Sequence, residues 1–203
     1  MWQGAWLRAV GSIDRFMSAR SRDTHLPPRL LAHLPDHGKI LDVGTFDGRI
    51  ARDLMDRNRK LSIIGADPRA PAETSIPVLP CDGSDLPFAD GAFEVVMLID
   101  VLHHDTNPAA IIAEALRVSR DRLVIKDHYW VTRWDWWLLA ISDYLGNRAY
   151  GVALPYNFLR LEQWREMFAQ LGASIETTET FTFSPYDRCK QVIFVVRGGA
   201  VAD

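Results

Sequence analysis

The chain has 203 residues, a length that fits one domain with modest additions rather than two. Apolar residues make up 48% of the sequence and charged residues 24%, ordinary globular values that exclude a disordered or collagen-like chain. The formal charge is −3 and the basic residues are scattered, so we expect no nucleic-acid partner. Seven tryptophans are present, four of them within residues 130–137, an excess over what folding requires.

Cysteine content and the N-terminal sequence bear on the compartment. The two cysteines, Cys81 and Cys189, lack the spacing of metal ligands, which excludes a disulfide scaffold and a cysteine-based zinc site. Charged residues interrupt the apolar N-terminal stretch, so it does not read as a signal peptide. No run approaches the ~18 apolar residues of a membrane-spanning helix. The sequence therefore predicts a cytoplasmic protein without a transmembrane segment.

The middle of the chain alternates short apolar runs with amphipathic segments. Strands are predicted at residues 39–43, 61–66, 76–80, 93–99 and 123–125, and helices at 49–55 and 108–118. Apolar strands separated by helices are typical of a parallel sheet covered on both faces. The predicted fold class is therefore α/β and doubly wound.

The C-terminal part follows another pattern. Residues 162–171 predict a helix, and residues 173–183 and 189–197 are both rich in strand formers. The connection at 184–187 is so short that it can join only antiparallel strands. We therefore expect the sheet to end in an antiparallel hairpin.

Three strand ends carry residues suited to an adenosyl ligand, because open α/β sheets bind ligands at the carboxyl ends of their strands. Gly44 and Gly48 follow the first strand, where glycine allows a tight turn and a close ligand. Asp67 follows the second strand at an offset suited to ribose hydroxyls. Asp82 follows the third, where a carboxylate can meet an adenine amino group. Singly, each is more ordinary: such an aspartate is usually a helix N-cap.

Three segments, ILDVGTFDGRIARDL, IIGADPR and CDGSDLPFADGAFEVVMLIDVLHH, resemble the class I S-adenosylmethionine-dependent methyltransferases. The resemblance covers roughly residues 38–126. It implies a Rossmann-like sheet of seven strands, mostly parallel with an antiparallel C-terminal hairpin. It also implies S-adenosylmethionine as cofactor and methyl transfer to an oxygen, nitrogen or carbon of a small acceptor.

The resemblance also assigns cofactor roles. Asp42, Gly44 and Gly48 would line the methionine half of the cofactor, and Asp100 would lie beside the sulfonium. Asp67 would hold the ribose. The full implied set is Asp42, Gly44, Thr45, Gly48, Asp67, Pro68, Asp82, Gly83 and Asp100, in which Asp82 and the Gly83 N–H would read the adenine.

Phe46 departs from the family pattern, which has a glycine at the middle of this loop. Phenylalanine disfavours a positive φ and fills space near the methionine end of the cofactor. Either the loop adapts or cofactor affinity falls. The alternative function is therefore a catalytically degenerate, methyltransferase-fold binding or scaffold protein. A dinucleotide-dependent enzyme is disfavoured, because the Gly-x-Gly-x-x-Gly pattern is missing.

Three histidines are candidate catalytic bases. His103 and His104 follow the fourth strand and His128 follows the fifth, so all should face one cleft. Imidazole has the pKa to accept a proton from an acceptor, and Asp127 can orient His128. Methyl transfer to an activated sulfonium can also proceed by positioning alone. No metal is expected, the alternative being a divalent ion on Asp100, Asp127 and His128.

Four of the seven tryptophans fall in a predicted insertion at residues 130–160. Its apolar residues recur at the spacing of one face of a four-turn helix: Trp130, Val131, Trp134, Trp137, Leu138, Ile141, Tyr144 and Leu145. This face is expected to pack on the core, with Asp143 on the opposite side and Gly146 to Arg148 breaking the helix. A second interpretation is that the helix, with Trp2, Trp6 and Phe16, roofs a site for an apolar or aromatic acceptor. A third is peripheral membrane contact through Trp6 and Trp136, which a helix that is not basic disfavours.

The predicted organisation is one methyltransferase-like domain. It comprises an N-terminal helical cover at 1–36, a cofactor-binding core at 37–128, a helical substrate cover at 129–160, and a helix with the terminal hairpin at 161–203.

Overall fold

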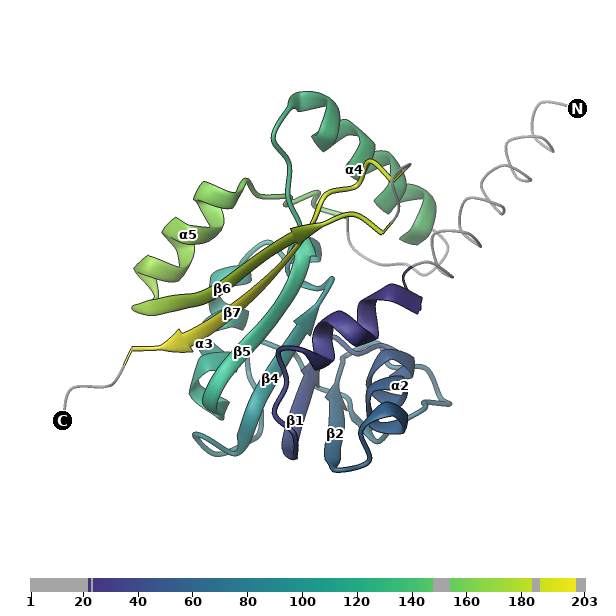
Figure 1. Ribbon diagram of the computed structural model, residues 1–203, viewed down its shortest axis with the longest axis vertical. Coiled ribbons are helices and arrows are strands. Elements are labelled where there is room, and N and C mark those ends of the chain that lie inside the picture. Colours follow the sequence, from purple (N-terminus) through teal and green to yellow (C-terminus); the bar gives the residue numbers. More distant parts are fainter. Residues whose placement is uncertain (1–21, 23, 148–153, 184–186, 200–203) are drawn as a thin grey trace, which may run out of the picture.

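A computed structural model describes residue 22 and residues 24–147, 154–183 and 187–199 (Figure 1). Most of the predicted N-terminal cover, with Trp2, Trp6 and Phe16, lies outside the described residues, as does most of the turn at 184–187. In the described part of the chain, no helix is long and apolar enough to cross a bilayer.

The fold is built on a seven-stranded sheet of order β3-β2-β1-β4-β5-β7-β6. The strands are β1 (Gly38–Val43), β2 (Leu61–Ala66), β3 (Val78–Leu79), β4 (Phe93–Ile99), β5 (Ser119–His128), β6 (Ala173–Phe181) and β7 (Gln191–Gly198). β1 to β5 pair in parallel, whereas β7 is antiparallel to both β5 and β6. The predicted α/β class, mostly parallel sheet and antiparallel C-terminal hairpin are confirmed.

Helices cover both faces of this sheet. They are α2 (Arg49–Arg57), α3 (Pro108–Val118), α4 (Arg133–Asn147), α5 (Leu161–Gln170), the 3₁₀ turn η1 (Leu102–His104) and a helix at residues 24–31. α3 begins as its sequence predicts, because the Asn107 side chain accepts from the Ala110 N–H and proline occupies the first turn.

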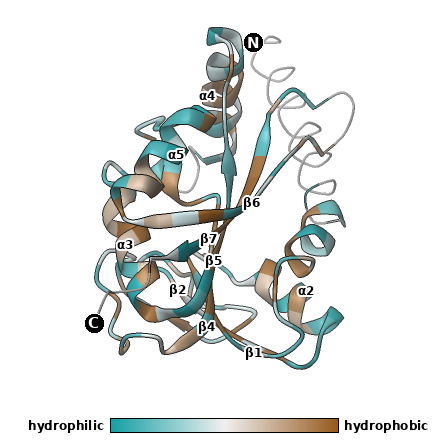
Figure 2. Ribbon diagram, turned by 60° about the vertical axis from the view of Figure 1, so that its left-hand side comes forward, coloured by the Kyte–Doolittle hydropathy of each residue, from teal (hydrophilic) through white to brown (hydrophobic). Residues whose placement is uncertain are grey.

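Alternation along the buried strands creates two apolar cores. Leu41 of β1 faces α3 and α5, whereas its neighbour Ile40 faces α2 and the 24–31 helix. Trp164 of α5 is 1% exposed and belongs to the first of these cores. Figure 2 shows the helices on the two sides of the sheet. This sandwich fixes the strand ends, and therefore the residues that follow them.

α4 lies beyond the carboxyl end of β5 (Figure 1), and its orientation corrects the predicted packing. Most of the predicted buried face is exposed: Val131 (53%), Trp134 (79%), Trp137 (53%), Leu138 (36%), Ile141 (54%) and Tyr144 (47%). The buried residues are Leu139 and Ala140, which pack with Phe158 in a small separate core. Asp143, predicted on the solvent side, is 7% exposed. The expectation that the apolar stripe packs on the core is therefore wrong.

The limits of α4 also differ from the prediction. The helix begins at Arg133 because the Asp135 carboxylate accepts from the Thr132 N–H and the Thr132 hydroxyl accepts from the Asp135 N–H. It continues through Gly146, which was expected to break it. A single glycine costs a helix only about 1 kcal/mol, which neighbouring turns offset.

Candidate active site

The Gly44–Gly48 loop connects β1 to α2 and requires glycine at both ends. Gly44 has φ 74°, and a Cβ there would lie 2.3 Å from a methyl carbon of Val101. Gly48 has φ 73°, and its Cβ would lie 2.5 Å from Ile76 Cγ1. Both glycines are therefore needed for conformation and for space.

Phe46 adopts a conformation that glycine favours. Its φ is 53°, its side chain is 40% exposed, and its N–H donates to Asp67 Oδ2 over 2.8 Å. A left-handed conformation costs a non-glycine residue roughly 1–2 kcal/mol. The loop thus accommodates Phe46 at some local strain and keeps its bridge to the end of β2.

Two buried carboxylates lie beside this loop. Asp42 is 3% exposed and accepts from the Thr45 hydroxyl over 2.6 Å, and its burial raises the pKa of Asp42 to about 7. Asp67 is 6% exposed, and its second oxygen accepts from the Arg69 N–H over 2.7 Å. Each carboxylate oxygen has two lone pairs, so both Asp67 oxygens can also accept from a ligand.

The residues after β2 and β3 lie nearer the surface. Pro68 is exposed, and so is Asp82, one of whose oxygens accepts from both the N–H and the hydroxyl of Ser84. These hydrogen bonds lower the pKa of Asp82. Gly83 packs closely, because a Cβ there would lie 2.9 Å from Val43 Cγ1.

Asp100 follows β4 and is held by two cations. Its Oδ1 accepts from Lys126 Nζ over 2.5 Å, and its Oδ2 lies 2.8 Å from Arg22 Nη2. Burial alone would raise the pKa of Asp100, but Lys126 and Arg22 outweigh it and hold that pKa below its usual range. Lys126 is 1% exposed, and its burial lowers its own pKa.

A histidine cluster lies next to Asp100. His103 is 3% exposed, its Nδ1 lies 2.6 Å from Asp127 Oδ1, and its ring stacks on Phe158 with centroids 5.2 Å apart. His104 (14% exposed) lies close to α4, and His128 (20% exposed) lies close to Asp100. The three predicted histidines therefore meet, with His103 at the centre.

The three imidazoles differ in pKa because their electrostatic surroundings differ. Burial by itself lowers the pKa of His103, but the Asp127 carboxylate outweighs it and raises that pKa to about 10. Burial and the neighbouring His103 lower the pKa of His104 to about 4. Burial and Lys126 lower the pKa of His128. At neutral pH the central ring is thus cationic and the outer two are neutral.

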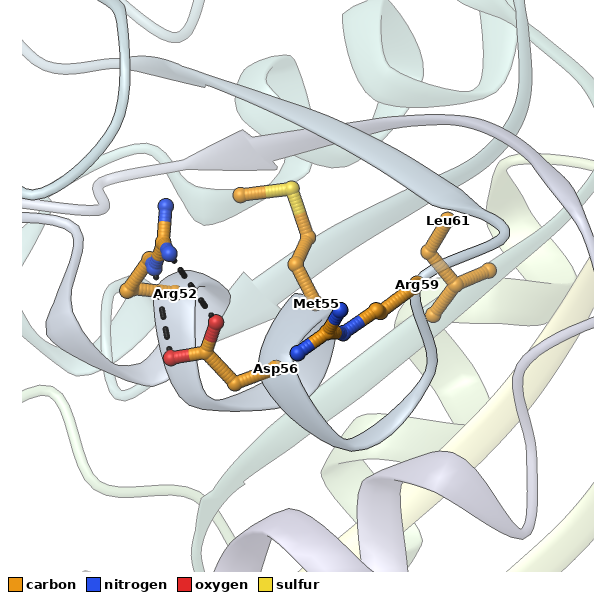
Figure 3. A pocket seen from close by; sticks show the side chains of 5 residues that line it. All are labelled: Arg52, Met55, Asp56, Arg59 and Leu61. Atoms are coloured by element: carbon orange, nitrogen blue, oxygen red, sulfur yellow. Dashed lines mark hydrogen bonds and ion pairs between the residues drawn. The ribbon is translucent and has the colours of Figure 1, made fainter.

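The donor and acceptor set fits S-adenosylmethionine. Four carboxylates, those of Asp42, Asp67, Asp82 and Asp100, lie at or after the ends of β1 to β4, at the ligand-binding edge of the sheet. They suit a ligand with amino and hydroxyl donors and a cationic centre. In the Gly44–Gly48 loop the Thr45 side chain is held by Asp42 and that of Asp47 by Arg49, whereas the Phe46 side chain is 40% exposed. A surface depression lined by Arg52, Met55, Asp56, Arg59 and Leu61 lies at the start of β2, the opposite edge (Figure 3).

Sequence reasoning missed several residues of this site: Arg22, Lys126, Asp143, Asn147 and Phe158. Lys126 interrupts an apolar strand, and a lysine buried there signals an ionic partner. Asp143 was placed on the solvent side of its helix, because polar residues of an amphipathic helix usually face solvent.

The comparisons with known proteins agree with this geometry. Residues 41–122 match the family model described as "Methyltransferase domain". No curated protein sequence matches the chain.

Solved structures share the fold at low sequence identity. A chain in the complex between the Haloferax volcanii Trm112 methyltransferase activator and the putative methyltransferase has a TM-score of 0.70, 16% identity and coverage of 97% of both chains. Burkholderia thailandensis 1,6-didemethyltoxoflavin-N1-methyltransferase, with bound 1,6-didemethyltoxoflavin and S-adenosylhomocysteine, has a TM-score of 0.66, 13% identity and coverage of 97% of this chain and 90% of that chain. A Thermotoga maritima S-adenosylmethionine-dependent methyltransferase, described as a possible histamine N-methyltransferase, has a TM-score of 0.66, 18% identity and coverage of 97% and 100%. Residues 41–122 therefore resemble a methyltransferase domain, and the chain shares its fold with solved S-adenosylmethionine-dependent methyltransferases.

Proposed function

We propose that the chain methylates an oxygen, nitrogen or carbon of a small acceptor with an apolar or aromatic body. The observation that carries the proposal is that His104 and His128 both contact His103, with His128 beside Asp100 at the strand end next to the candidate cofactor residues. His128 Nδ1 lies 3.5 Å from Asp100 Oδ1 and, within the described part of the chain, makes no hydrogen bond.

An aromatic series supports an aromatic acceptor. The rings of Trp136 and Tyr156 lie 6.3 Å apart, those of Tyr156 and Phe158 6.5 Å, and those of Phe158 and His128 6.2 Å. Aromatic side chains offer flat apolar surface with geometric preference for other rings. An acceptor placed beside His128 would meet such a surface.

When bound, the cofactor supplies an activated methyl group. The chain's own residues would hold it as the resemblance implies: Asp42, Gly44, Thr45 and Gly48 at the methionine half, Asp67 and Pro68 at the ribose, Asp82 and Gly83 at the adenine, and Asp100 near the sulfonium. His128 would receive the acceptor's proton, and His104 would contact the acceptor from the other side. His103, at 3% exposure, would position these groups rather than touch the acceptor.

The proposal extends to the setting of the reaction. Cys81 and Cys189 are not joined in a disulfide, which supports a reducing compartment, the cytoplasm. The acceptor we propose is a small molecule rather than nucleic acid, in keeping with the acidic net charge of −3.

His128→Ala is expected to lower kcat by about 10²–10⁴-fold, the usual contribution of a positioned proton acceptor, with little change in the KM for S-adenosylmethionine. The measurement is release of S-adenosylhomocysteine in the presence of small phenols, enols and heteroaromatic amines, with products identified by mass. His25→Ala, at an exposed position on the 24–31 helix, is the matched control. Equal rates for the two variants would show that His128 takes no part in transfer.

A further inference from the structure

We propose that His103, His104 and Asp143 bind a divalent transition-metal ion, which holds the reacting oxygen or nitrogen of the acceptor. The role toward the acceptor rests on the proposed function, whereas binding of the ion does not. The three side chains come from η1 and from α4, two elements far apart in the sequence.

The spacing of the ligand atoms carries the proposal. Asp143 Oδ1 lies 3.8 Å from His103 Nε2 and 3.7 Å from His104 Nε2, beyond hydrogen-bond distance in both cases. The three ligand atoms all lie within 4.8 Å of one another. Ligands bound about 2.0–2.1 Å from a tetrahedral Zn²⁺ stand roughly 3.3 Å apart. The two distances to Asp143 would therefore each shorten by about half an ångström when an ion binds.

Supporting hydrogen bonds already orient two of the ligands. Asp127 Oδ1 lies 2.6 Å from His103 Nδ1 and so turns His103 Nε2 toward Asp143. A carboxylate on the far nitrogen of a metal-binding histidine is a recurrent feature of metal sites, because it fixes the ring and raises its basicity. Asn147 Nδ2 donates to Asp143 Oδ1 over 2.6 Å and fixes that carboxylate in the same way.

An unpartnered oxygen gives independent support. The Asp143 side chain is 7% exposed, and its buried Oδ2 has no hydrogen-bond partner among the residues that the structure describes. Leaving a buried carboxylate oxygen unsatisfied is costly, so native structures usually supply a partner, water or an ion. Asp127 and Asp143 bring two negative charges to the cluster. The protonated His103 ring balances one of them, and a bound dication would release the His103 Nε2 proton and take over that balance.

Other ligand sets in the cluster fit less well. His103, Asp127 and His128 also lie together, but the 2.6 Å contact between His103 and Asp127 is a hydrogen bond, with the proton where an ion would have to bind. Asp100, named in the alternative set from the sequence, already has one oxygen on Lys126 and the other on Arg22, so neither oxygen is available as a metal ligand.

The donor types identify the ion. Two imidazoles and one carboxylate suit Zn²⁺, Fe²⁺ or Co²⁺ rather than Mg²⁺ or Ca²⁺, which prefer oxygen ligands. Three protein ligands leave a coordination position open, as in catalytic zinc sites. An acceptor oxygen or nitrogen bound at that position would lie beside His128 and Phe158, whose rings contact His103.

Cobalt(II) titration of the full chain, produced without a polyhistidine tag and treated with a chelator, tests this inference. We expect uptake of one equivalent, with visible absorption bands typical of low-coordinate Co²⁺ and displacement by Zn²⁺. Asp143→Ala and His104→Ala should each weaken binding by more than about 100-fold, since even the loss of a group that only hydrogen-bonds to a metal ligand costs 10–100-fold. Asp135→Asn is the matched control on α4, because it removes a carboxylate whose ion-pair partner is Lys190, while the asparagine oxygen can still accept from the Thr132 N–H.

Calorimetric titration with S-adenosylhomocysteine separates this inference from the proposed function. The Asp143 and His104 variants should bind it like the wild type, which also shows that they are folded. Asn147→Ala, which keeps all three ligands, should weaken Co²⁺ binding by about 10–100-fold. Failure of the wild type to take up Co²⁺, or equal affinity in the wild type and Asp143→Ala, would overturn the metal site whatever the outcome of methyl transfer.

Discussion

Asp100→Ala is expected to lower the free energy of unfolding by about 3–5 kcal/mol, the cost of leaving a buried charge without its partner. Lys126 lies within β5 at 1% exposure, and its ammonium donates to Asp100 over 2.5 Å. Truncating Asp100 leaves that ammonium among apolar strands and also removes the partner of Arg22. Denaturant unfolding, followed by far-UV circular dichroism, measures the loss.

Two further variants show whether desolvation is the cause. The double variant Asp100→Ala, Lys126→Met should recover most of the loss, because an apolar pair of similar volume removes the unpaired charge. Asp56→Ala breaks the exposed Arg52–Asp56 pair on α2, and it should cost less than about 1 kcal/mol. If Asp100→Ala costs no more than Asp56→Ala, Lys126 does not depend on Asp100 for its burial.

The free energy of unfolding of Asp42→Asn should increase relative to that of the wild type by up to about 4 kcal/mol as the pH rises from about 4 to about 8. Burial raises the pKa of Asp42 from 3.8 to about 7 in the folded chain. Between those values the folded chain keeps a proton that the unfolded chain has lost. The wild-type contribution therefore decreases with rising pH, whereas asparagine does not titrate.

The measurement is the difference in unfolding free energy between the wild type and Asp42→Asn across this pH range, so that other titrating groups cancel. Asp53→Asn, on the exposed face of α2, is the control. Its free energy of unfolding should change with pH in the same way as that of the wild type. A constant difference between wild type and Asp42→Asn would mean that Asp42 is ionised in the folded chain.

Most of the sheet was predictable because buried parallel strands are apolar runs with few alternative interpretations. β3 is shorter than predicted and β5 longer, at Val78–Leu79 and Ser119–His128. The extra residues of β5 are polar, and they are strand because they pair with β4 at the edge of the core. Pairing of this kind leaves no trace in apolar periodicity.

α4 was mispredicted for a different reason. Its pattern of apolar residues is real, but the face that turns inward is set by Leu139, Ala140 and Asp143 and by what they contact. Periodicity identifies which residues share a face and not which face is buried. The tryptophans of α4 accordingly divide, with Trp136 packed on the small core and Trp134 and Trp137 exposed.

The site residues that lie directly after strands could be predicted from the sequence. Residues directly after strands, such as Asp67, Asp100 and His128, are placed by the sheet itself. Arg22 and Asp143 reach the same place from a helix before the sheet and an insertion after it, and no short-range pattern joins them to Asp100 or His104.

Titration calorimetry with S-adenosylhomocysteine tests the central claim most directly, that the Gly44–Gly48 loop with its Phe46 forms a working cofactor site. The account predicts binding of one equivalent, weakened in Asp67→Ala by roughly 1–3 kcal/mol for the loss of charge-assisted hydrogen bonds. Absence of binding at millimolar ligand, or equal affinity in the wild type and Asp67→Ala, would contradict it.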